Sequence, residues 1–496
     1  MNLDWSLLAP EYVLAGWAAL LVSVDLFWPR FPKGYLGYLA AAGALAALTT
    51  ALISHPWINE DATDFAGLID INNYTTFFRV FFALIAFFAC LASVRYVQQR
   101  LLHPGEYYAL ILLAALGANY MAGARELLSA YISLELLSFS LYVLTSYAKF
   151  DLRSNEGGLK YMILGAFSSA LFLYGMSLIY GVTGTTRFDD IAGALAGDTD
   201  GFRLALFLGL VLIIAGLGFK VAAVPFHMWT PDAYEGAPMP VAALISAISK
   251  AAGFALFLKL FAMAFLPLVD DWRPFLAGLA AATMILGNLV AIQQHNIKRL
   301  LAYSSIGQVG FLMMGIAALS PENTDAASAL VLHLTGYVIS NLAAFVCAII
   351  YYNWTGKEEI ADYDGLAERA PFLALCLSIA LFSLAGMPLF AGFATKFILF
   401  QAAAEGDLLW LAAVAVFMSF VSLYYYLVVI RRMYLGQPAE AGRFPTPWME
   451  YAALSLLVLG VFLVGLYPQP LFNAVDQSTA LIFSAGQATG GIIAGP

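Results

Sequence analysis

The feature that most constrains this chain is a succession of long apolar runs that fill nearly all of its 496 residues. Charged residues make up only 11% of the chain, against roughly 25% in soluble domains. A water-soluble protein of this length needs more charge than that to cover its surface, so that class is excluded. The runs are also too continuously apolar for a porin-type barrel, whose strands alternate over about 10 residues. We therefore predict an all-α polytopic membrane protein.

A helix that crosses the hydrocarbon core needs about 20 apolar residues, and this length divides the chain into about fourteen predicted spans. They cover residues 12–28, 35–53, 75–96, 107–121, 127–147, 159–182, 204–226, 241–265, 275–291, 300–319, 326–352, 372–404, 408–434 and 448–467. The segment after residue 467 is partly apolar but too short and too polar to span, so we expect a surface helix or strap there.

The loop charges predict the orientation. Most Lys and Arg residues outside the spans lie on the side that the first helix leads to. Positively charged loops face the cytoplasm, so we predict that this side is cytoplasmic and that both termini are periplasmic.

When the Lys and Arg residues of loops and helix ends are set aside, four lysines remain inside the predicted spans, namely Lys220, Lys250, Lys259 and Lys396. A charge at the middle of a membrane costs roughly 2.5–3.5 kcal/mol on insertion scales. Lysine also loses its proton readily when it is buried, so a buried lysine is a candidate proton carrier. For Lys259, near the end of its span, an amine that reaches the headgroups is an equally good interpretation.

One acid matches these lysines. Glu135 lies in the middle of the fifth span, where an isolated carboxylate would be neutral or paired. Pairing with a lysine from another helix would keep both groups charged, and breaking the pair would release the lysine's proton. Forming or breaking such a pair can therefore control whether the lysine binds or releases a proton to a relay. His227, at the cytoplasmic end of the seventh span, and His333, in the eleventh, could extend the path, although His333 fits an ordinary buried histidine equally well.

Two prolines stand near these lysines in the sequence. Pro225 follows Lys220 by five residues, and Pro388 precedes Lys396 by eight. A proline removes one helical hydrogen bond, and discontinuous helices beside ionisable groups are typical of transporters. We therefore predict that helices 7 and 12 are broken. An ordinary proline kink would explain the prolines but not the neighbouring lysines.

The positions of Lys220 and Lys396 suggest an internal repeat. Each lies in the fourth helix of a five-helix unit, and two units with an odd number of helices would be inverted in the membrane. The predicted units are residues 1–106 (helices 1–3), 107–268 (first repeat), 269–436 (second repeat) and 437–496 (helix 14 and the C-terminal segment).

The chain carries no nucleotide-binding, flavin, iron–sulfur or metal-ligand motif. We therefore predict that it binds no cofactor or metal itself, and no nucleic acid. Its energy would come from an ion gradient or from a partner protein.

Several motifs together are specific. They are LELLS (134–138), NEGGLKY (155–161), FKVAAVPFHMWTPDAYEGAP (219–238), SKAA (249–252), NIKRLLAYSSI (296–306) and residues 386–388 with Gly392, Phe393 and Lys396. With these motifs the chain resembles the N subunits of bacterial respiratory complex I, the NADH–quinone oxidoreductase, over nearly its whole length. Some motifs also occur in the related L and M subunits and in multisubunit cation antiporters, but NEGGLKY and the short C-terminus favour N.

The resemblance implies an antiporter-like fold with two inverted five-helix repeats, in the inner membrane of a bacterium. It implies that Glu135 pairs with Lys220, that Lys250 is the central relay, and that Lys396 is the terminal proton carrier. Electron transfer from NADH to quinone would take place in partner subunits, which hold the flavin and iron–sulfur clusters. This electron transfer would drive the transport of protons through the chain. Leu389 stands where the family usually has a second proline, which predicts a milder break in helix 12.

Three alternatives remain. The first is a subunit of a multisubunit cation/proton antiporter, or of a related membrane-bound dehydrogenase or hydrogenase. The second is a stand-alone solute carrier, which would need a pocket with polar substrate-binding groups. The third is a structural anchor for pumping neighbours, which predicts that neutralising Glu135 and the lysines leaves pumping intact.

Overall fold

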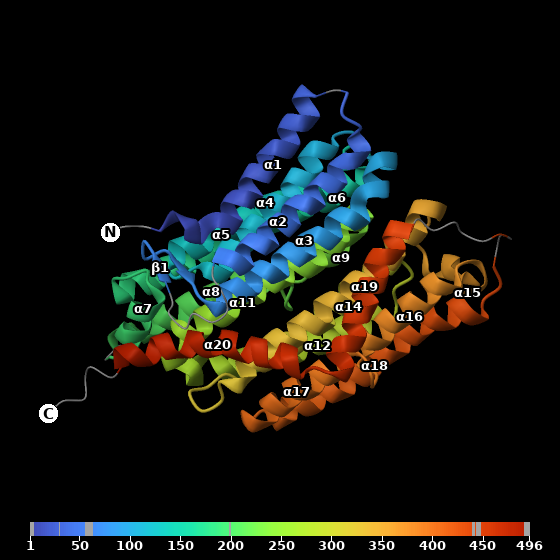
Figure 1. The fold of residues 1–496 in the computed structure, drawn as a ribbon. Coiled ribbons are helices and arrows are strands. Elements are labelled where there is room, and N and C mark those ends of the chain that lie inside the picture. Colours follow the sequence, from blue (N-terminus) through green and yellow to red (C-terminus); the bar gives the residue numbers. More distant parts are fainter. Residues whose placement is uncertain are drawn as a thin grey trace.

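Long α-helices make up most of the computed structural model, which describes residues 4–28, 30–54, 63–197, 200–438, 442 and 448–490 (Figure 1). The first helices are α1 (Ala9–Phe27), α2 (Leu36–Ser54), α3 (Asn73–Arg100), α4 (Pro104–Gly123), α5 (Leu127–Thr145), α6 (Leu152–Thr183), α7 (Phe188–Leu195), α8 (Arg203–Val221), α9 (Trp229–Gly236), α10 (Met239–Leu244) and α11 (Lys250–Met263). They are followed by α12 (Val269–Ala291), α13 (Ile297–Ala317), α14 (Asp325–Thr355), α15 (Leu366–Arg369), α16 (Pro371–Ala385), α17 (Ala391–Glu405), α18 (Leu409–Leu435), α19 (Trp448–Leu466) and α20 (Gln469–Gly490). A short antiparallel hairpin, β1 (Thr63–Phe65) and β2 (Ile69–Ile71), precedes α3.

Twelve helical segments among the described residues are long and apolar enough to cross a membrane, and each coincides with a predicted span. The multi-pass, all-α fold class is therefore confirmed. The two other predicted spans are also helical: α4 covers 107–121, and α16 and α17 share 372–404. The exact number of fourteen crossings, the inverted repeats and the four predicted units stay predictions. Parts of the first and last units (1–3, 29, 55–62, 439–441, 443–447 and 491–496) lie outside the described residues.

Both predicted breaks are present. Helix α8 ends at Val221, where Ala222 takes a left-handed conformation with φ of 72°, and the short α9 follows seven residues later. In the twelfth predicted span, residues 386–390 separate α16 from α17, and Gly386 and Leu389 have φ of 88° and 79°. Leu389 therefore does not make this break mild, because the helix is interrupted completely.

A further irregularity was not predicted. Between α10 and α11 the backbone forms a π-helical turn, Ile245–Ser249, which ends directly before Lys250. Such turns inside α-helices are rare and are frequent at functional sites. Lys220, Lys250 and Lys396 therefore each lie close in sequence to an irregular stretch of helix.

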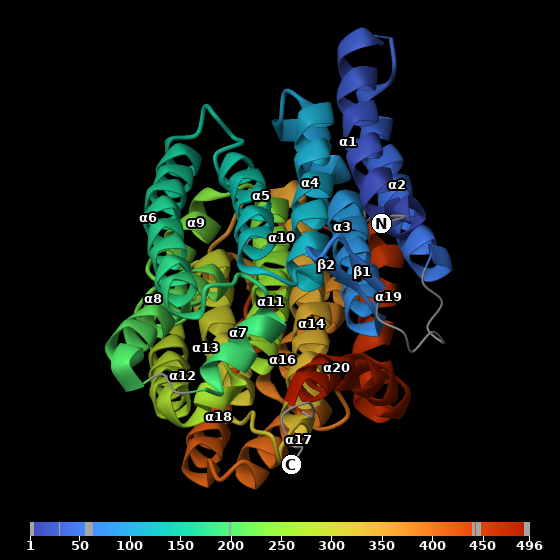
Figure 2. The same cartoon turned by 90° about the vertical axis from the view of Figure 1, so that its left-hand side faces the viewer.

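The arrangement of the helices leaves the lysine-bearing segments inside the bundle. Figure 2 shows α1 and α2 at one edge, beside α3 and α4, and α6 with α8 at the other edge. Helices α11, α13 and α14 lie between these edges, and nearly all of their residues are buried. This explains how Lys250 and Lys259, both on α11, are removed from lipid, since protein rather than hydrocarbon surrounds them.

The segment after residue 467 forms the long helix α20, which confirms the expected surface strap. Figure 1 shows this red helix lying across the other helices rather than along them. It contacts α3, α7, α11 and α14, so it joins elements from distant parts of the sequence. Ser328 of α14 fastens it through hydrogen bonds to Asp476 (3.0 Å) and Thr479 (2.7 Å).

Candidate site: a row of buried lysines

All four predicted lysines are enclosed by protein, and three of them have no carboxylate partner among the described residues. Lys220, Lys250 and Lys396 expose 2%, 0% and 3% of their surfaces, and they come from α8, α11 and α17. No described carboxylate forms an ion pair with any of them. An ammonium group buried without a counter-ion is costly. The neutral amine carries no such cost.

Lys220 is held by a hydroxyl group rather than by the predicted acid. Its Nζ donates a hydrogen bond of 2.9 Å to Ser138 Oγ on α5. Glu135 lies one helical turn earlier on α5, half-buried, and its Oε1 is buried without a hydrogen-bond partner. The two charges interact electrostatically, but no direct ion pair joins them. Glu135 and Lys220 are therefore neighbours, and their pairing stays a prediction.

Lys250 lies in an aromatic cage formed by α9. Its Nζ donates a hydrogen bond to the Tyr234 hydroxyl, and it stands 4.8 Å from the Tyr234 ring centroid and 5.5 Å from that of Trp229. Aromatic faces attract cations, so the cage can hold the ammonium without a carboxylate. The Trp229 indole is fixed by a hydrogen bond of 3.0 Å to the Phe219 carbonyl, near the broken end of α8.

The connection between Lys220 and Lys250 is short. Ser249, which directly precedes Lys250, donates a hydrogen bond of 3.1 Å to the backbone carbonyl of Lys220. The break in α8 and the π-helical turn before α11 therefore meet at this point, and they bring the two lysine positions together.

Lys396 is held by the broken end of α16. Its Nζ donates to the carbonyls of Leu384 (2.9 Å) and Ala385 (3.4 Å) and to Ser419 Oγ (3.1 Å). The last carbonyls of a helix have no partner within the helix, so the interruption supplies acceptors that a continuous helix would not. The ring of Phe311 lies 4.8 Å from the ammonium and closes the site. A hollow of about 380 Å³ reaches Lys396 from between α17 and α18.

Lys259 belongs to a separate cluster. Its Nζ lies 3.1 Å from Asp70 of β2 and bonds the carbonyls at the end of α4. Asp70 also pairs with Arg125, which in turn pairs with Asp189. Lys259 stands nine residues along α11 from Lys250, about 13 Å at the helical rise. The structure therefore places it in an ion-pair cluster that fastens the hairpin, away from the other three lysines.

The two histidines lie near the row in different ways. His333 Nδ1 is 3.1 Å from Thr395 Oγ1, next to Lys396, while its Nε2 is buried without a partner. His227 lies in the segment between α8 and α9, two residues after Pro225 and half-buried. Burial lowers the pKa of His227, so the neutral ring is favoured there. Both stay candidates for the proton path.

An ion-pair network fastens α9 on its outer side. Asp232 lies between Lys160 (2.8 Å) and Arg299 (3.1 Å), and Arg299 also pairs with Glu235 (2.7 Å). Burial alone would raise the pKa of Asp232, but hydrogen bonds from Lys160 and Arg299 outweigh it and lower that pKa. One short helix therefore bears Asp232 and Glu235 on its outer face and the cage of Lys250 on its inner face.

Sequence reasoning missed a buried ion pair in the N-terminal helices. Arg79 of α3 binds Glu11 of α1 through two hydrogen bonds, of 2.8 and 2.9 Å, and both side chains are 1% exposed. Asn119 of α4 adds a hydrogen bond of 3.2 Å to Glu11. The only sequence signal for this pair is an acid and an arginine near the starts of two apolar runs. At such positions both residues resemble ordinary charges at the membrane interface.

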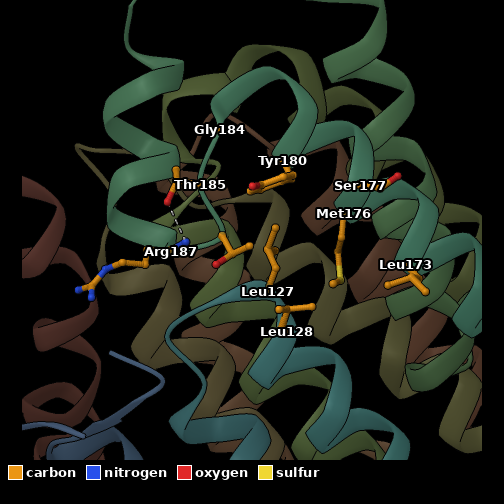
Figure 3. A pocket seen from close by; sticks show the side chains of 10 residues that line it. Leu127, Leu128, Leu173, Met176, Ser177, Tyr180, Gly184, Thr185 and Arg187 are labelled. Carbon is orange, nitrogen blue, oxygen red and sulfur yellow. Dashed lines mark hydrogen bonds between the residues drawn. The ribbon is translucent and has the colours of Figure 1, made fainter. Parts of the chain in front are cut away.

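A hollow of about 580 Å³ lies apart from the lysines, at the ends of α5 and α6. Three leucines and Met176 line part of it, and Figure 3 shows the Arg187 side chain directed away from Leu127 and Leu128. Among the described residues, no group of His, Cys, Asp or Glu side chains could hold a metal ion. The groups that the candidate site brings together are lysine amines, with hydroxyls and backbone carbonyls as their hydrogen-bond acceptors.

Comparison with known proteins places this geometry in a family. Residues 124–422 match the family described as "NADH:quinone oxidoreductase/Mrp antiporter, TM". The chain is 42% identical over 481 residues to the NADH-quinone oxidoreductase subunit N of Moorella thermoacetica, covering 96% of this chain and 98% of that protein. It is 41% identical over 482 residues to the NAD(P)H-quinone oxidoreductase subunit 2 of Gloeothece citriformis, covering 95% and 93%. A chain of respiratory complex I from Thermus thermophilus with bound aureothin superposes with a TM-score of 0.77 at 30% identity, covering 94% and 99%.

Proposed function

This chain belongs to the NADH:quinone oxidoreductase/Mrp antiporter family, and we propose that, as an antiporter-like membrane subunit of complex I, it carries protons through Lys220, Lys250 and Lys396. The other subunits of the complex are its partners. In the proposal, flavin, iron–sulfur clusters and quinone are bound by those partners, and no electron passes through this chain. The complex would lie in the bacterial inner membrane with both termini of this chain in the periplasm.

The observation that carries the proposal is the enclosure of three amines without counter-ions, each beside an irregular stretch of helix. A structural lysine would be paired, as Lys259 is with Asp70. These three lysines instead meet hydroxyls, aromatic faces and carbonyls, which hold an ammonium without preventing the loss of its proton. Such partners suit a group that must alternate between charged and neutral forms.

In this mechanism, redox energy released in partner subunits reaches the chain at Glu135. A carboxylate that approaches Lys220 favours its ammonium, and a carboxylate that withdraws favours the free amine. The orphan Oε1 of Glu135 and the bond from Lys220 to Ser138 fit the separated state. The proton then passes to Lys250, to Lys396 and across the membrane.

The test uses the whole purified complex reconstituted in liposomes. Lys220→Ala should lower the ratio of protons pumped to electrons transferred, while NADH–quinone activity persists. Lys149→Ala, which removes an exposed loop lysine, is the matched control and should leave the ratio unchanged. Full pumping in Lys220→Ala would remove Lys220 from the mechanism. Full pumping in the alanine variants of Lys220, Lys250 and Lys396 alike would favour a structural anchor.

Purification in gentle detergent separates this assignment from the cation/proton antiporter alternative. Flavin and iron–sulfur subunits should co-purify, together with NADH–quinone activity. Isolation of the chain with antiporter subunits alone would mean gradient-driven exchange instead.

A further inference from the structure

Helix α13 fills the space between Lys250 and Lys396. It contacts both α11 and α17, which carry these two lysines. Three of its polar residues, Ser304, Ser305 and Gln308, are at least 98% buried within an otherwise apolar stretch. Ser305 and Gln308 are three residues apart, so they lie on one face about 4.5 Å apart along the axis. Polar groups buried so deeply must be satisfied by specific partners.

At the Lys250 end, the partner is the Tyr234 hydroxyl. It accepts the hydrogen bond from Lys250 Nζ, and it interacts electrostatically with Ser305 of α13. Tyr234 is 0% exposed, so no bulk water competes for the bond to Lys250. One phenol therefore lies between the central lysine and α13.

At the Lys396 end, the shared group is a backbone carbonyl. Gln308 Nε2 donates to the Leu384 carbonyl at 3.0 Å, and Lys396 Nζ donates to the same oxygen at 2.9 Å. The break in helix 12 leaves this carbonyl available to both. Gln308 is thereby fixed next to the terminal lysine.

The middle of this path contains unsatisfied acceptors. Gln308 Oε1 and Asn341 Oδ1 are buried without any hydrogen-bond partner, and their residues are 2% and 0% exposed. Asn341 uses its amide nitrogen to donate to Ser246 Oγ at 2.6 Å. Buried orphan acceptors of this kind are the places where proteins hold internal water.

A second tyrosine near Ser305 does not continue the path. The Tyr337 hydroxyl lies 2.8 Å from Ser305 Oγ but donates its own proton to the Ser246 carbonyl at 3.0 Å. A backbone carbonyl cannot pass a proton on, so this branch ends there. On the other side, Ser304 is hydrogen-bonded to Tyr426, which is also within reach of Gln308.

We propose that Tyr234 and Ser305 carry the proton from Lys250 onto α13, and that Gln308 positions a buried water that delivers it to Lys396. This proposal rests on the proposed function and assigns the connection between its second and third lysines. Tyr234 and Ser305 are proton carriers, whereas Gln308 is a positioning residue, since an amide does not itself relay protons.

Each transfer conserves atoms and charge. Lys250 gives a proton to Tyr234 Oη as the Tyr234 hydroxyl gives its own to Ser305. Ser305 then passes a proton to the water on Gln308 Oε1, which protonates the neutral amine of Lys396. Lys250 ends as the free amine, Lys396 ends as the ammonium, and every hydroxyl is restored.

The experiment compares variants in the whole complex reconstituted in liposomes, with the proton/electron ratio as the readout. Tyr234→Phe and Gln308→Leu should lower the ratio as much as Lys396→Ala does. Gln308→Glu retains an oxygen at the water site and should restore pumping, which a purely structural role would not predict. Tyr74→Phe is the matched control, because its hydroxyl is equally buried and donates to a carbonyl of α11 (Ala255, 2.7 Å) off this path.

The outcomes separate this inference from the proposed function. If Lys396→Ala lowers the ratio but Tyr234→Phe and Gln308→Leu do not, the path through α13 is wrong and the lysine relay stands. If Lys396→Ala also pumps normally, the relay itself is wrong. Should Gln308→Leu fail to assemble, Ser305→Ala removes a single oxygen and decides the same question, with a wild-type ratio counting against the path.

Discussion

At the scale of single residues, the partner of a buried charge separates two kinds of group. Those with a structural role are paired with a carboxylate, and those proposed to exchange protons are not. Arg79 and Lys259 have carboxylates at hydrogen-bonding distance, whereas Lys220, Lys250 and Lys396 do not. The sequence could predict that Lys220, Lys250 and Lys396 are buried, because their flanks are apolar, but not that Lys298 is. It could not predict their partners, since hydroxyls such as Ser138 and Tyr234 carry no charge and are brought close only by tertiary packing. Ser305 stands in a quoted motif and Gln308 two residues after it, yet nothing in their spacing pointed to a path.

The Glu11–Arg79 pair gives a prediction about stability at this scale. Arg79→Leu should destabilise the N-terminal helices by about 3–5 kcal/mol, because it leaves a buried carboxylate without its partner. The double variant Glu11→Leu/Arg79→Leu should recover most of that loss, since no buried charge remains. Thermal unfolding of the purified complex measures both. A double variant as unstable as the single one would contradict this explanation.

At the scale of elements, the interruptions of the helices shape the surroundings of the three lysines more than the regular helices do. The breaks in helices 7 and 12 could be predicted, because Pro225 and Pro388 stand close to lysines. The π-helical turn before Lys250 could not, since Ile245–Ser249 contains neither proline nor glycine. The complete interruption at Leu389 also exceeded expectation, because the left-handed conformations of Gly386 and Leu389 stop the helix without a second proline.

Helix α9 yields a prediction that depends on pH. Asp232→Asn should weaken the fastening of α9 by no more than about 1 kcal/mol, since its ion pairs are partly exposed. Hydrogen exchange of the peptide that contains Trp229–Gly236 should become faster at neutral pH. Because folding lowers the pKa of Asp232, its contribution is full above the ordinary value of 3.8 and is lost as pH falls through the lowered value. The difference between variant and wild type should therefore vanish in strong acid.

The control for this prediction is Glu156→Gln. It removes the other carboxylate that binds Lys160, in an exposed pair within α6 that does not involve α9. Exchange in α9 should stay at the wild-type rate in this variant. Equal acceleration in both variants would mean that Lys160, rather than Asp232, sets the rate.

At the scale of the whole molecule, apolar runs were enough to predict a multi-pass helical protein. All fourteen predicted spans coincide with helices, because a run of about 20 apolar residues has few other stable forms in lipid. The position of α20 could not be predicted in the same way. Its residues indicated a surface strap, but which helices it joins depends on the packing of the entire bundle.

Removal of α20 tests its contribution to the assembled bundle. A chain that ends at Tyr467 should give a complex with a lower unfolding temperature, because α20 buries Val475 and Ile482 against its neighbours. Asn473→Ala, an exposed change on the same helix, should behave as wild type. An unchanged unfolding temperature after the truncation would show that the contacts of α20 add nothing to stability.

The strap formed by α20 also limits how this protein can change shape. Many transporters expose a central site to alternate sides by rocking one bundle of helices against another. A helix that is packed on α3, α7, α11 and α14 at once resists such rigid-body rotation, because each of these contacts would have to slide. The proposed proton transfer would therefore proceed by local rearrangement and wetting of narrow paths between the lysines, without rigid-body rotation of one helix bundle against another.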